Sequence, residues 1–391
     1  MKNILRVSNI RALSALLAVL LTIPLSWKGL TGFYTWLSPF IMLNSVFVLK
    51  SFVFLNLAGF IIVLLVLLRN RWFCRYLCPV GWSCDLVSRF SRRKTSDYKH
   101  LPEIGKWIAL LSLAAALAGL PLFILLDPMA IFYSFFTAIS VKTTILVIVS
   151  LSGFPVLLAL HLYFPGIWCN KLCPLGGLQG VLSDIKAQLA ILFARKNSEQ
   201  TSQGASRRLF IASGIGLTAG FLIPGLLKPG DVNYIRPPAS VKPELFNTLC
   251  IRCGNCIKVC PTGIITHHTL PGSLLAWMTP EVRYADGYCL ETCNLCSKVC
   301  PSGSITLFNV KAKNQLFMGT AEVHLANCLL TKNTECDRCK VSCKFAALEI
   351  VPDYQSLQSK PVIETSRCVG CGACAVICPE STIFMKPPLS V

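Results

Sequence analysis

Long apolar segments dominate the chain as far as Leu227. They cover residues 12–30, 52–68, 106–126, 143–164 and 209–227. Each is close to the length of about 20 residues that an α-helix needs to cross the hydrocarbon core of a bilayer. Basic residues gather in the polar loops after the second and the fourth segment. The pattern predicts an α-helical membrane bundle of about five transmembrane helices, with these loops and the N-terminus on the cytoplasmic side.

The polar boundaries divide the chain into four expected parts. A four-helix membrane domain is expected over 1–205, a fifth transmembrane anchor over 206–227, a proline-rich linker over 228–245 and a separate domain over 246–391. The anchor opens with Ser206-Arg207-Arg208-Leu209-Phe210, which is typical of a twin-arginine export signal; the alternative is an ordinary basic anchor before a span. An odd number of spans predicts a multi-pass protein of the bacterial inner membrane, in contact with the lipid bilayer, with its last domain in the periplasm.

The last domain is organised by a repeat of cysteines. Four runs of four begin at Cys250, Cys289, Cys328 and Cys368, at a nearly constant interval. A C-x2-C-x2-C loop brings three thiolates to one [4Fe–4S] cube, and a fourth cysteine before a proline ligates the neighbouring cube in two-cluster ferredoxins. The expected metal ligands are Cys250, Cys253, Cys256, Cys260, Cys289, Cys293, Cys296, Cys300, Cys328, Cys336, Cys339, Cys343, Cys368, Cys371, Cys374 and Cys378.

The spacing also bears on the alternatives and on the local fold. Structural zinc sites usually pair two C-x2-C knuckles across a longer gap, and neither zinc nor a disulfide framework calls for four three-plus-one runs. An apolar residue stands five positions after each fourth cysteine, at Ile265, Ile305, Leu348 and Ile383, and predicts a short strand there. We therefore expect small α+β ferredoxin-like repeats built around four [4Fe–4S] clusters. The runs can pair consecutively or in a nested order.

The third run departs from this pattern in two ways. Cys328 precedes Cys336 by eight positions, and Lys344 stands where the other runs have proline. The signal for a cluster is therefore weakest in this run.

A second set of cysteines lies in the first half. Cys74 and Cys78, and again Cys169 and Cys173, form two C-x3-C-P loops after the second and fourth apolar segments. Together they offer four thiolates, enough for one further iron–sulfur centre or for redox-active dithiols; the alternative is structural thiols at helix ends. We expect Cys84 to be a plain thiol and the lone His161 to serve interhelical hydrogen bonding.

Charge and composition narrow the functional classes. The formal net charge is +19, and residues 1–208 hold 21 Lys and Arg against six Asp and Glu. Because this basic excess flanks apolar segments and forms no groove pattern, a nucleic-acid partner is not expected. No C-x-x-C-H motif and no glycine-rich dinucleotide loop occurs, which argues against c-type haem and against a nicotinamide or flavin dinucleotide.

The two halves resemble two bacterial families. The C-x3-C-P half is similar to the NapH/MauN type of membrane ferredoxin-like protein, and the C-terminal half resembles the NapG/MauM type of four-cluster ferredoxin. The resemblance implies an electron carrier, rather than a stand-alone enzyme, that relays electrons between the quinone pool and an exported reductase or dehydrogenase. The alternative is a maturation factor that reduces metal or thiol groups of a partner respiratory enzyme. No acid–base pair stands near the repeats, so no catalytic residue is expected.

Overall fold

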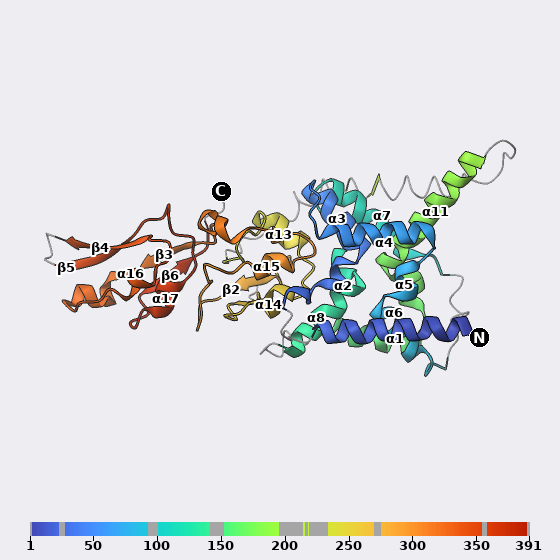
Figure 1. The fold of residues 1–391 in the computed structure, drawn as a ribbon, viewed down its shortest axis with the longest axis horizontal. Coiled ribbons are helices and arrows are strands. Elements are labelled where there is room, and N and C mark those ends of the chain that lie inside the picture. Colours follow the sequence, from blue (N-terminus) through green and yellow to red (C-terminus); the bar gives the residue numbers. More distant parts are fainter. Residues whose placement is uncertain are drawn as a thin grey trace. The chain divides into compact units, whose positions relative to one another are not determined.

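The computed structural model describes residues 2–22, 28–92, 101–140, 152–194, 214–215, 218, 234–269, 275–353 and 358–388. The chain divides into two compact units. The helical unit comprises Met1–Lys228 with two short segments, Thr248–Asn255 and Pro301–Gly303. The cysteine-repeat unit comprises Pro229–Asn247, Cys256–Cys300 and Ser304–Val391. Figure 1 draws the start of the chain in blue and green and its end in yellow to red.

The helical unit consists largely of short helices joined by tight turns. Helices α1 and α11 have 21 residues each, α7 has 14, and the other described helices of the unit are shorter. The described elements are α1 (Lys2–Thr22), η1 (Lys28–Leu30), α2 (Phe33–Trp36), α3 (Pro39–Leu49), α4 (Asn56–Leu68), α5 (Trp72–Tyr76), α6 (Pro79–Ser88), α7 (Ile104–Leu117), η3 (Ile124–Leu126), α8 (Pro128–Ser140), α10 (Gly153–Tyr163), the π-helix η4 (Trp168–Leu172) and α11 (Pro174–Ala194).

The same turn starts four of these helices. Proline is the first helical residue of α3, α6, α8 and α11, where its fixed φ suits a helix and its missing N–H is not needed. The preceding side chain accepts a hydrogen bond from the first turn of the helix. The acceptors are Ser38 Oγ (from Ile41 N, 3.5 Å), Cys78 Sγ (from Gly81 N, 3.2 Å), Asp127 Oδ1 (from Met129 N, 2.8 Å) and Cys173 Sγ (from Gly176 N, 3.5 Å). Each C-x3-C-P loop therefore ends in a sulfur-capped helix.

The predicted transmembrane bundle is wrong. Within the described ranges, no helix combines the length and the apolar character that crossing a bilayer requires. The multi-pass inner-membrane placement depended on those spans and is contradicted by the same finding. Residues 209–227 lie outside the described part of the chain except for Gly214, Ile215 and Thr218, and so does much of the segment predicted over 143–164.

Local backbone signals divide the apolar segments. In the segment predicted over 106–126, α7 ends at Leu117 and Gly119 follows with φ +91°. The amides of Gly119 and Leu120 bond back to Ala116 and Ala115, both at 3.0 Å, which is the Schellman arrangement that closes a helix. In the segment predicted over 52–68, the helix begins only at Asn56 and has 13 residues. A hydropathy profile alone does not predict where these helices begin and end.

The core of the helical unit is aromatic and closely packed. Tyr34, Phe40, Phe73, Phe132 and Tyr133 are among its fully buried side chains. Helices α7 and α11 approach closely at two glycines, since a Cβ on Gly177 would lie 2.1 Å from the Gly105 carbonyl oxygen. A Cβ on Gly105 would lie 2.5 Å from the carbonyl oxygen of Cys173. This backbone contact holds α7 against the start of α11 and against Cys173, which precedes it.

Short helices and two-stranded sheets alternate through the cysteine repeats. The described residues of this unit form three antiparallel pairs, β1 with β2, β3 with β6 and β4 with β5. The elements are α13 (Pro243–Leu249), α14 (Asn255–Val259), β1 (Ile265–His267), β2 (Pro280–Val282), α15 (Leu295–Lys298), η5 (Val310–Gln315), β3 (Thr320–Val323), η6 (Leu325–Asn327), η7 (Leu329–Lys332), α16 (Arg338–Ser342), β4 (Leu348–Asp353), β5 (Gln358–Ile363), α17 (Ala373–Ile377) and β6 (Ile383–Lys386).

The strand predictions from the repeat are confirmed for three of the four runs. Strands β1, β4 and β6 begin at Ile265, Leu348 and Ile383, and all three side chains are buried. Ile305 is buried as well, but it pairs with Ser240 in a single bridge and begins no strand. The α+β ferredoxin-like part of the predicted fold is therefore correct.

Candidate iron–sulfur sites

Four short helices position the third cysteine of each run. Each begins just before that cysteine and ends at or before the residue that precedes the fourth. They are α14 with Cys256, α15 with Cys296, α16 with Cys339 and α17 with Cys374. In the first, second and fourth runs the turn before the helix holds the other loop cysteines, whereas Cys328 of the third run lies between η6 and η7. The fourth cysteine of every run follows the end of its helix. The sequence spacing thus becomes a three-dimensional set of three loop thiols and one outlying thiol.

Two cavities show which runs pair. Cys260, the fourth cysteine of the first run, lines a cavity with Cys289, Cys293 and Cys296 of the second. A second cavity brings Cys343 of the third run to the three loop cysteines of the fourth run, Cys368, Cys371 and Cys374. Pairing is consecutive, the first run with the second and the third with the fourth. The nested order that the sequence left open does not occur at these two cavities.

Donors converge on the outlying sulfur atoms. Ile305 N–H lies 3.4 Å from Cys300 Sγ, Ala347 N–H 3.3 Å from Cys343 Sγ, and Thr382 N–H 3.4 Å from Cys378 Sγ. Burial alone would raise the pKa of Cys378, but the hydroxyl and backbone amide of Thr382 and further backbone donors lower it below its usual value. Such donors stabilise a thiolate, and hydrogen bonds to ligand sulfurs are one of the means by which a protein sets a cluster's potential.

The loop cysteines have the opposite environment. Burial and the like charge of neighbouring thiols raise the pKa of Cys371 to about 11 and that of Cys374 to about 12. Burial likewise raises the pKa of Cys339 to about 11, with Cys336 and Cys328 adding to the effect. Thiols with pKa values this high stay protonated near neutral pH. They lose their protons when they bind a metal, because the metal's positive charge stabilises the thiolates. The residues present therefore fit iron–sulfur clusters.

A buried lysine adds a positive charge beside the second run. Lys313 has 2% of its surface exposed, and its Nζ donates to the carbonyl oxygens of Leu290 and, at 2.7 Å, Cys293. Burial raises the pKa of Cys289, and the nearby ammonium of Lys313 offsets part of that rise. No sequence pattern points to this lysine, because it comes from η5 and not from a cysteine run.

The second and fourth runs lie next to each other. The backbone N–H of Cys289 donates to the carbonyl of Cys371 at 2.9 Å. Tyr284 donates its hydroxyl to the Gly370 carbonyl at 2.5 Å. Its ring occupies space that a Cβ on Gly372 would need, since that atom would lie 2.1 Å from Tyr284 Cδ1, and Gly372 has φ +83°. A direct backbone contact therefore joins the two cysteine pairs.

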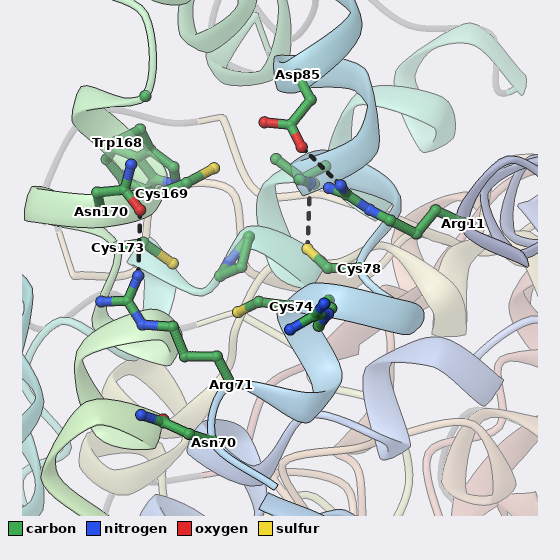
Figure 2. Close-up of a pocket in the computed structure, with 15 residues that line it drawn as sticks. Arg11, Asn70, Arg71, Cys74, Cys78, Asp85, Trp168, Cys169, Asn170 and Cys173 are labelled. Atoms are coloured by element: carbon green, nitrogen blue, oxygen red, sulfur yellow. Dashed lines mark hydrogen bonds and ion pairs between the residues drawn. The ribbon is translucent and has the colours of Figure 1, made fainter. Parts of the chain in front are cut away.

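The C-x3-C-P cysteines of the helical unit line one cavity. Cys74, Cys78, Cys169 and Cys173 surround a space of about 460 Å³, and Figure 2 shows their sulfur atoms directed toward it. Cys74 lies on α5 and Cys169 on η4, while Cys78 and Cys173 cap α6 and α11. Cys78 and Cys173 are buried, and the other two are half-buried. Two loops that lie far apart in the sequence thus bring four thiols together.

Cationic and polar side chains surround this cavity. Arg11, Arg71 and Arg75 line it, and Arg11 pairs with Asp85 at 2.7 Å (Figure 2). The amide nitrogen of Gln179 donates to Cys74 Sγ at 3.0 Å. Burial and the neighbouring Cys169 raise the pKa of Cys74 to about 12, although Gln179 and nearby arginines oppose the rise. Four thiols under a basic rim fit a metal centre that carries net negative charge with its thiolates.

The structure also gathers residues that the sequence does not associate with a site. The sequence predicts a plain thiol at Cys84 and a hydrogen-bonding histidine at position 161. One ligand atom each from Cys84, His161 and Cys169 lie within 4.8 Å of one another. Neither Cys84 nor His161 belongs to a motif, and they lie on different helices, so no spacing rule reveals the contact.

Comparisons with known proteins agree with this arrangement. A family described as a 4Fe-4S dicluster domain matches residues 249–304 and 332–382, which coincide with the first two and the last two cysteine runs apart from Cys328. A family described as a 4Fe-4S binding domain matches residues 51–96 and 146–196, which contain the two C-x3-C-P loops. No solved structure matches the chain.

Curated relatives match about two fifths of the chain. The ferredoxin-type protein NapF of Escherichia coli K12 is 32% identical over 152 residues, 39% of this chain and 84% of that protein. The ferredoxin-type protein NapG of the same strain is 31% identical over 166 residues, 40% of this chain and 69% of NapG. The methylamine utilization ferredoxin-type protein MauM of Paracoccus denitrificans is 27% identical over 181 residues, 43% of this chain and 78% of MauM.

The paired loops and these matches define the class: an iron–sulfur electron-transfer protein of the ferredoxin type. More particularly, the chain belongs to the family of ferredoxin-type proteins that includes NapF and NapG. The resemblance of the first half to NapH and MauN stays a prediction.

Proposed function

We propose that the chain conducts electrons through four [4Fe–4S] clusters arranged as two consecutive pairs, with a fifth iron–sulfur centre at the C-x3-C-P cysteines. Each cluster, when bound, accepts and returns a single electron. The cysteine thiolates hold the clusters, and the donors around the outlying sulfurs help to set their potentials. Lys313 contributes positive charge to the second run.

One observation carries this proposal: the contact between the second and fourth runs. The Cys289 N–H and the Cys371 carbonyl lie 2.9 Å apart, so two cluster-binding loops share a hydrogen bond. Tyr284 packs against Gly372 and bonds to Gly370 in the same place, and its half-buried ring covers part of this contact. Short separations favour electron transfer, and the arrangement supports one continuous path across both pairs.

Electron donor and acceptor are part of the proposal. We propose that a quinol supplies electrons and that a redox enzyme on another chain exchanges them, as the resemblance to NapG and MauM suggests. A quinol analogue added to anaerobic protein should then reduce the clusters within the turnover time of the partner enzyme. Failure of this reduction, while dithionite still reduces the clusters, would favour the maturation role instead.

The cluster count is tested by chemical analysis of the full-length protein. Anaerobically prepared protein should contain about 16 iron atoms per chain from the four runs and about 20 with the fifth centre. Cys293→Ser and Cys371→Ser should each remove about four. Cys74→Ser should remove about four only if the helical unit holds a centre. About 16 iron atoms per chain, unchanged in Cys74→Ser, would refute the fifth centre and would be consistent with the other four clusters.

The path itself is tested by electron paramagnetic resonance. In fully reduced protein, the clusters of the second and fourth runs should broaden each other's signals through magnetic interaction. Cys371→Ser should remove the part of that broadening that comes from the fourth-run cluster, while the coupling between the first- and second-run clusters remains. Thr306→Ser changes an exposed hydroxyl that bonds to Ala239 and serves as a control. A second-run signal that Cys371→Ser leaves unchanged would contradict the proposed path.

A further inference from the structure

Three residues of the helical unit form a second group of metal-binding type. Cys84 belongs to α6, His161 to α10 and Cys169 to η4. Their ligand atoms lie within 4.8 Å of one another, and the side chains of Cys84 and His161 are fully buried. The four C-x3-C-P cysteines account for Cys169 but leave the other two without a role.

The hydrogen bonding of His161 indicates which of its nitrogens can bind. Nδ1 lies 3.0 Å from the carbonyl oxygen of Leu157. A carbonyl only accepts, so Nδ1 carries the ring proton and the neutral imidazole keeps a lone pair on Nε2. Nε2 is buried and makes no hydrogen bond to a nitrogen or an oxygen of the described residues, and the thiol of Cys169 lies within hydrogen-bonding reach of the ring. Histidine ligands of metals commonly donate their other N–H to a backbone carbonyl in this way, which fixes the tautomer.

We propose that Cys84, Cys169 and His161 Nε2 bind a single Zn²⁺ ion. Two sulfurs and one nitrogen are donors that zinc prefers, with Zn–S near about 2.3 Å and Zn–N of roughly 2.0–2.1 Å. Donors around a tetrahedral zinc ion are then roughly 3.5 Å apart, so the three atoms need to close by at most about 1.3 Å. Binding forms two Zn–S bonds and one Zn–N bond and releases the two thiol protons to solvent.

The net charge of the site and the hydrogen bonding of His161 both favour the zinc-bound state over the metal-free state. Two thiolates and a divalent cation sum to zero, so the loaded site places no net charge among these buried side chains. Without a metal, the ring has the thiol of Cys169 as its side-chain hydrogen-bond partner, and a thiol is only a weak donor. Cys169 is also one of the cysteines that line the cavity of the C-x3-C-P loops.

Sharing of Cys169 makes the two metal sites competitors. A cluster that uses all four C-x3-C-P thiolates leaves the zinc site with only Cys84 and His161. A zinc ion at Cys169 leaves the cluster site with three thiolates. The zinc site and a fifth cluster are therefore alternatives at Cys169, whereas the electron path through the four C-terminal runs depends on neither.

The test measures zinc on full-length protein whose four C-terminal clusters are loaded and whose C-x3-C-P cysteines carry no cluster. Protein incubated anaerobically with Zn²⁺ and freed of loose metal with a weak chelator should retain one zinc per chain by elemental analysis. X-ray absorption at the zinc edge should show two sulfur neighbours and at least one nitrogen. Cys84→Ser and His161→Gln should each weaken retention by about 10-fold or more, the scale seen even when an outer partner of a metal ligand is lost.

Matched variants keep the result interpretable if a buried substitution disturbs folding. Cys74→Ser and Cys173→Ser lie in the same cavity but outside the trio, so both should keep the zinc ion. Circular dichroism and the iron content of the four C-terminal runs report on folding in every variant. A first shell of four sulfurs, zinc retained in both Cys84→Ser and His161→Gln, or no retained zinc at all would each overturn the proposal.

Discussion

The contact between α7 and α11 makes Gly177→Ala the most informative single change in the helical unit. Its Cβ would lie 2.1 Å from the Gly105 carbonyl oxygen and 2.2 Å from the carbonyl carbon. Ordinary contact begins near 3.4 Å, so the deficit is 3.4 Å less 2.1 Å, or about 1.3 Å. The obstacle is backbone on both sides, so relief requires the two helices to separate.

A magnitude follows from two opposing effects. Overpacking a close-packed interior costs about 1–3 kcal/mol and sometimes more, and a rigid backbone obstacle belongs at the upper end of that range. Alanine in place of a mid-helix glycine returns about 1 kcal/mol of helix propensity. We therefore expect Gly177→Ala to lose about 2 kcal/mol of unfolding free energy.

Gly180→Ala is the matched control, one turn further along the same buried face of α11. Its Cβ would meet only the end of a flexible side chain, Lys106 Cε at 2.7 Å. Moving Lys106 disturbs its ion pairs with Glu103 and Asp184, which are partly exposed and worth at most about 1 kcal/mol. Helix propensity offsets that loss, so this variant should be within about 1 kcal/mol of the parent.

Urea unfolding followed by circular dichroism measures both variants at equal cluster loading. The separation of the helices also moves the Cys173 carbonyl, which lies against Gly105, so Gly177→Ala should lower metal retention at the C-x3-C-P cavity. If Gly177→Ala proves as stable as Gly180→Ala, the close approach of α7 and α11 is wrong.

Two further substitutions test electrostatic features. Burial raises the pKa of Asp127 from its usual value of 3.8 to about 6, although hydrogen bonds from Ser38 and the α8 amides oppose the rise. Between pH 3.8 and about pH 6 the native carboxyl therefore keeps a proton that the unfolded chain has lost. Stability should fall by about 3 kcal/mol as pH rises through that window, and urea unfolding should show Asp127→Asn free of the fall. Lys313→Met removes a buried cation beside the second run and should lower the reduction potential of its cluster by roughly tens of millivolts in a redox titration, whereas exposed Lys311→Met should leave it unchanged.

The cysteine repeats could be predicted well because their information is local. Each loop needs only the spacing of its own cysteines, and the buried residue five positions on marks where a strand begins at Ile265, Leu348 and Ile383. Pairing of the runs could not be predicted, since it depends on where Cys260 and Cys343 point after their helices end.

The first half shows the limits of hydropathy. A window of apolar residues does not distinguish one long helix from two short ones separated by a turn, and the Schellman closure at Gly119 divides such a window. The C-x3-C-P loops can be recognised because they repeat. Cys84, His161 and Gln179 cannot, because their contacts join distant helices and leave no periodic trace in the sequence.

The four helices that begin with proline use one turn with interchangeable cap atoms. Oxygen caps α3 and α8 through Ser38 and Asp127, and sulfur caps α6 and α11 through Cys78 and Cys173. At Cys78 and Cys173, a change between serine oxygen and cysteine sulfur converts a turn that only caps a helix into one that also offers a metal ligand. The reverse exchange, Cys78→Ser or Cys173→Ser, keeps a hydrogen-bond acceptor at the helix start while removing the thiolate, so the architecture and the chemistry of this unit are separable at one atom.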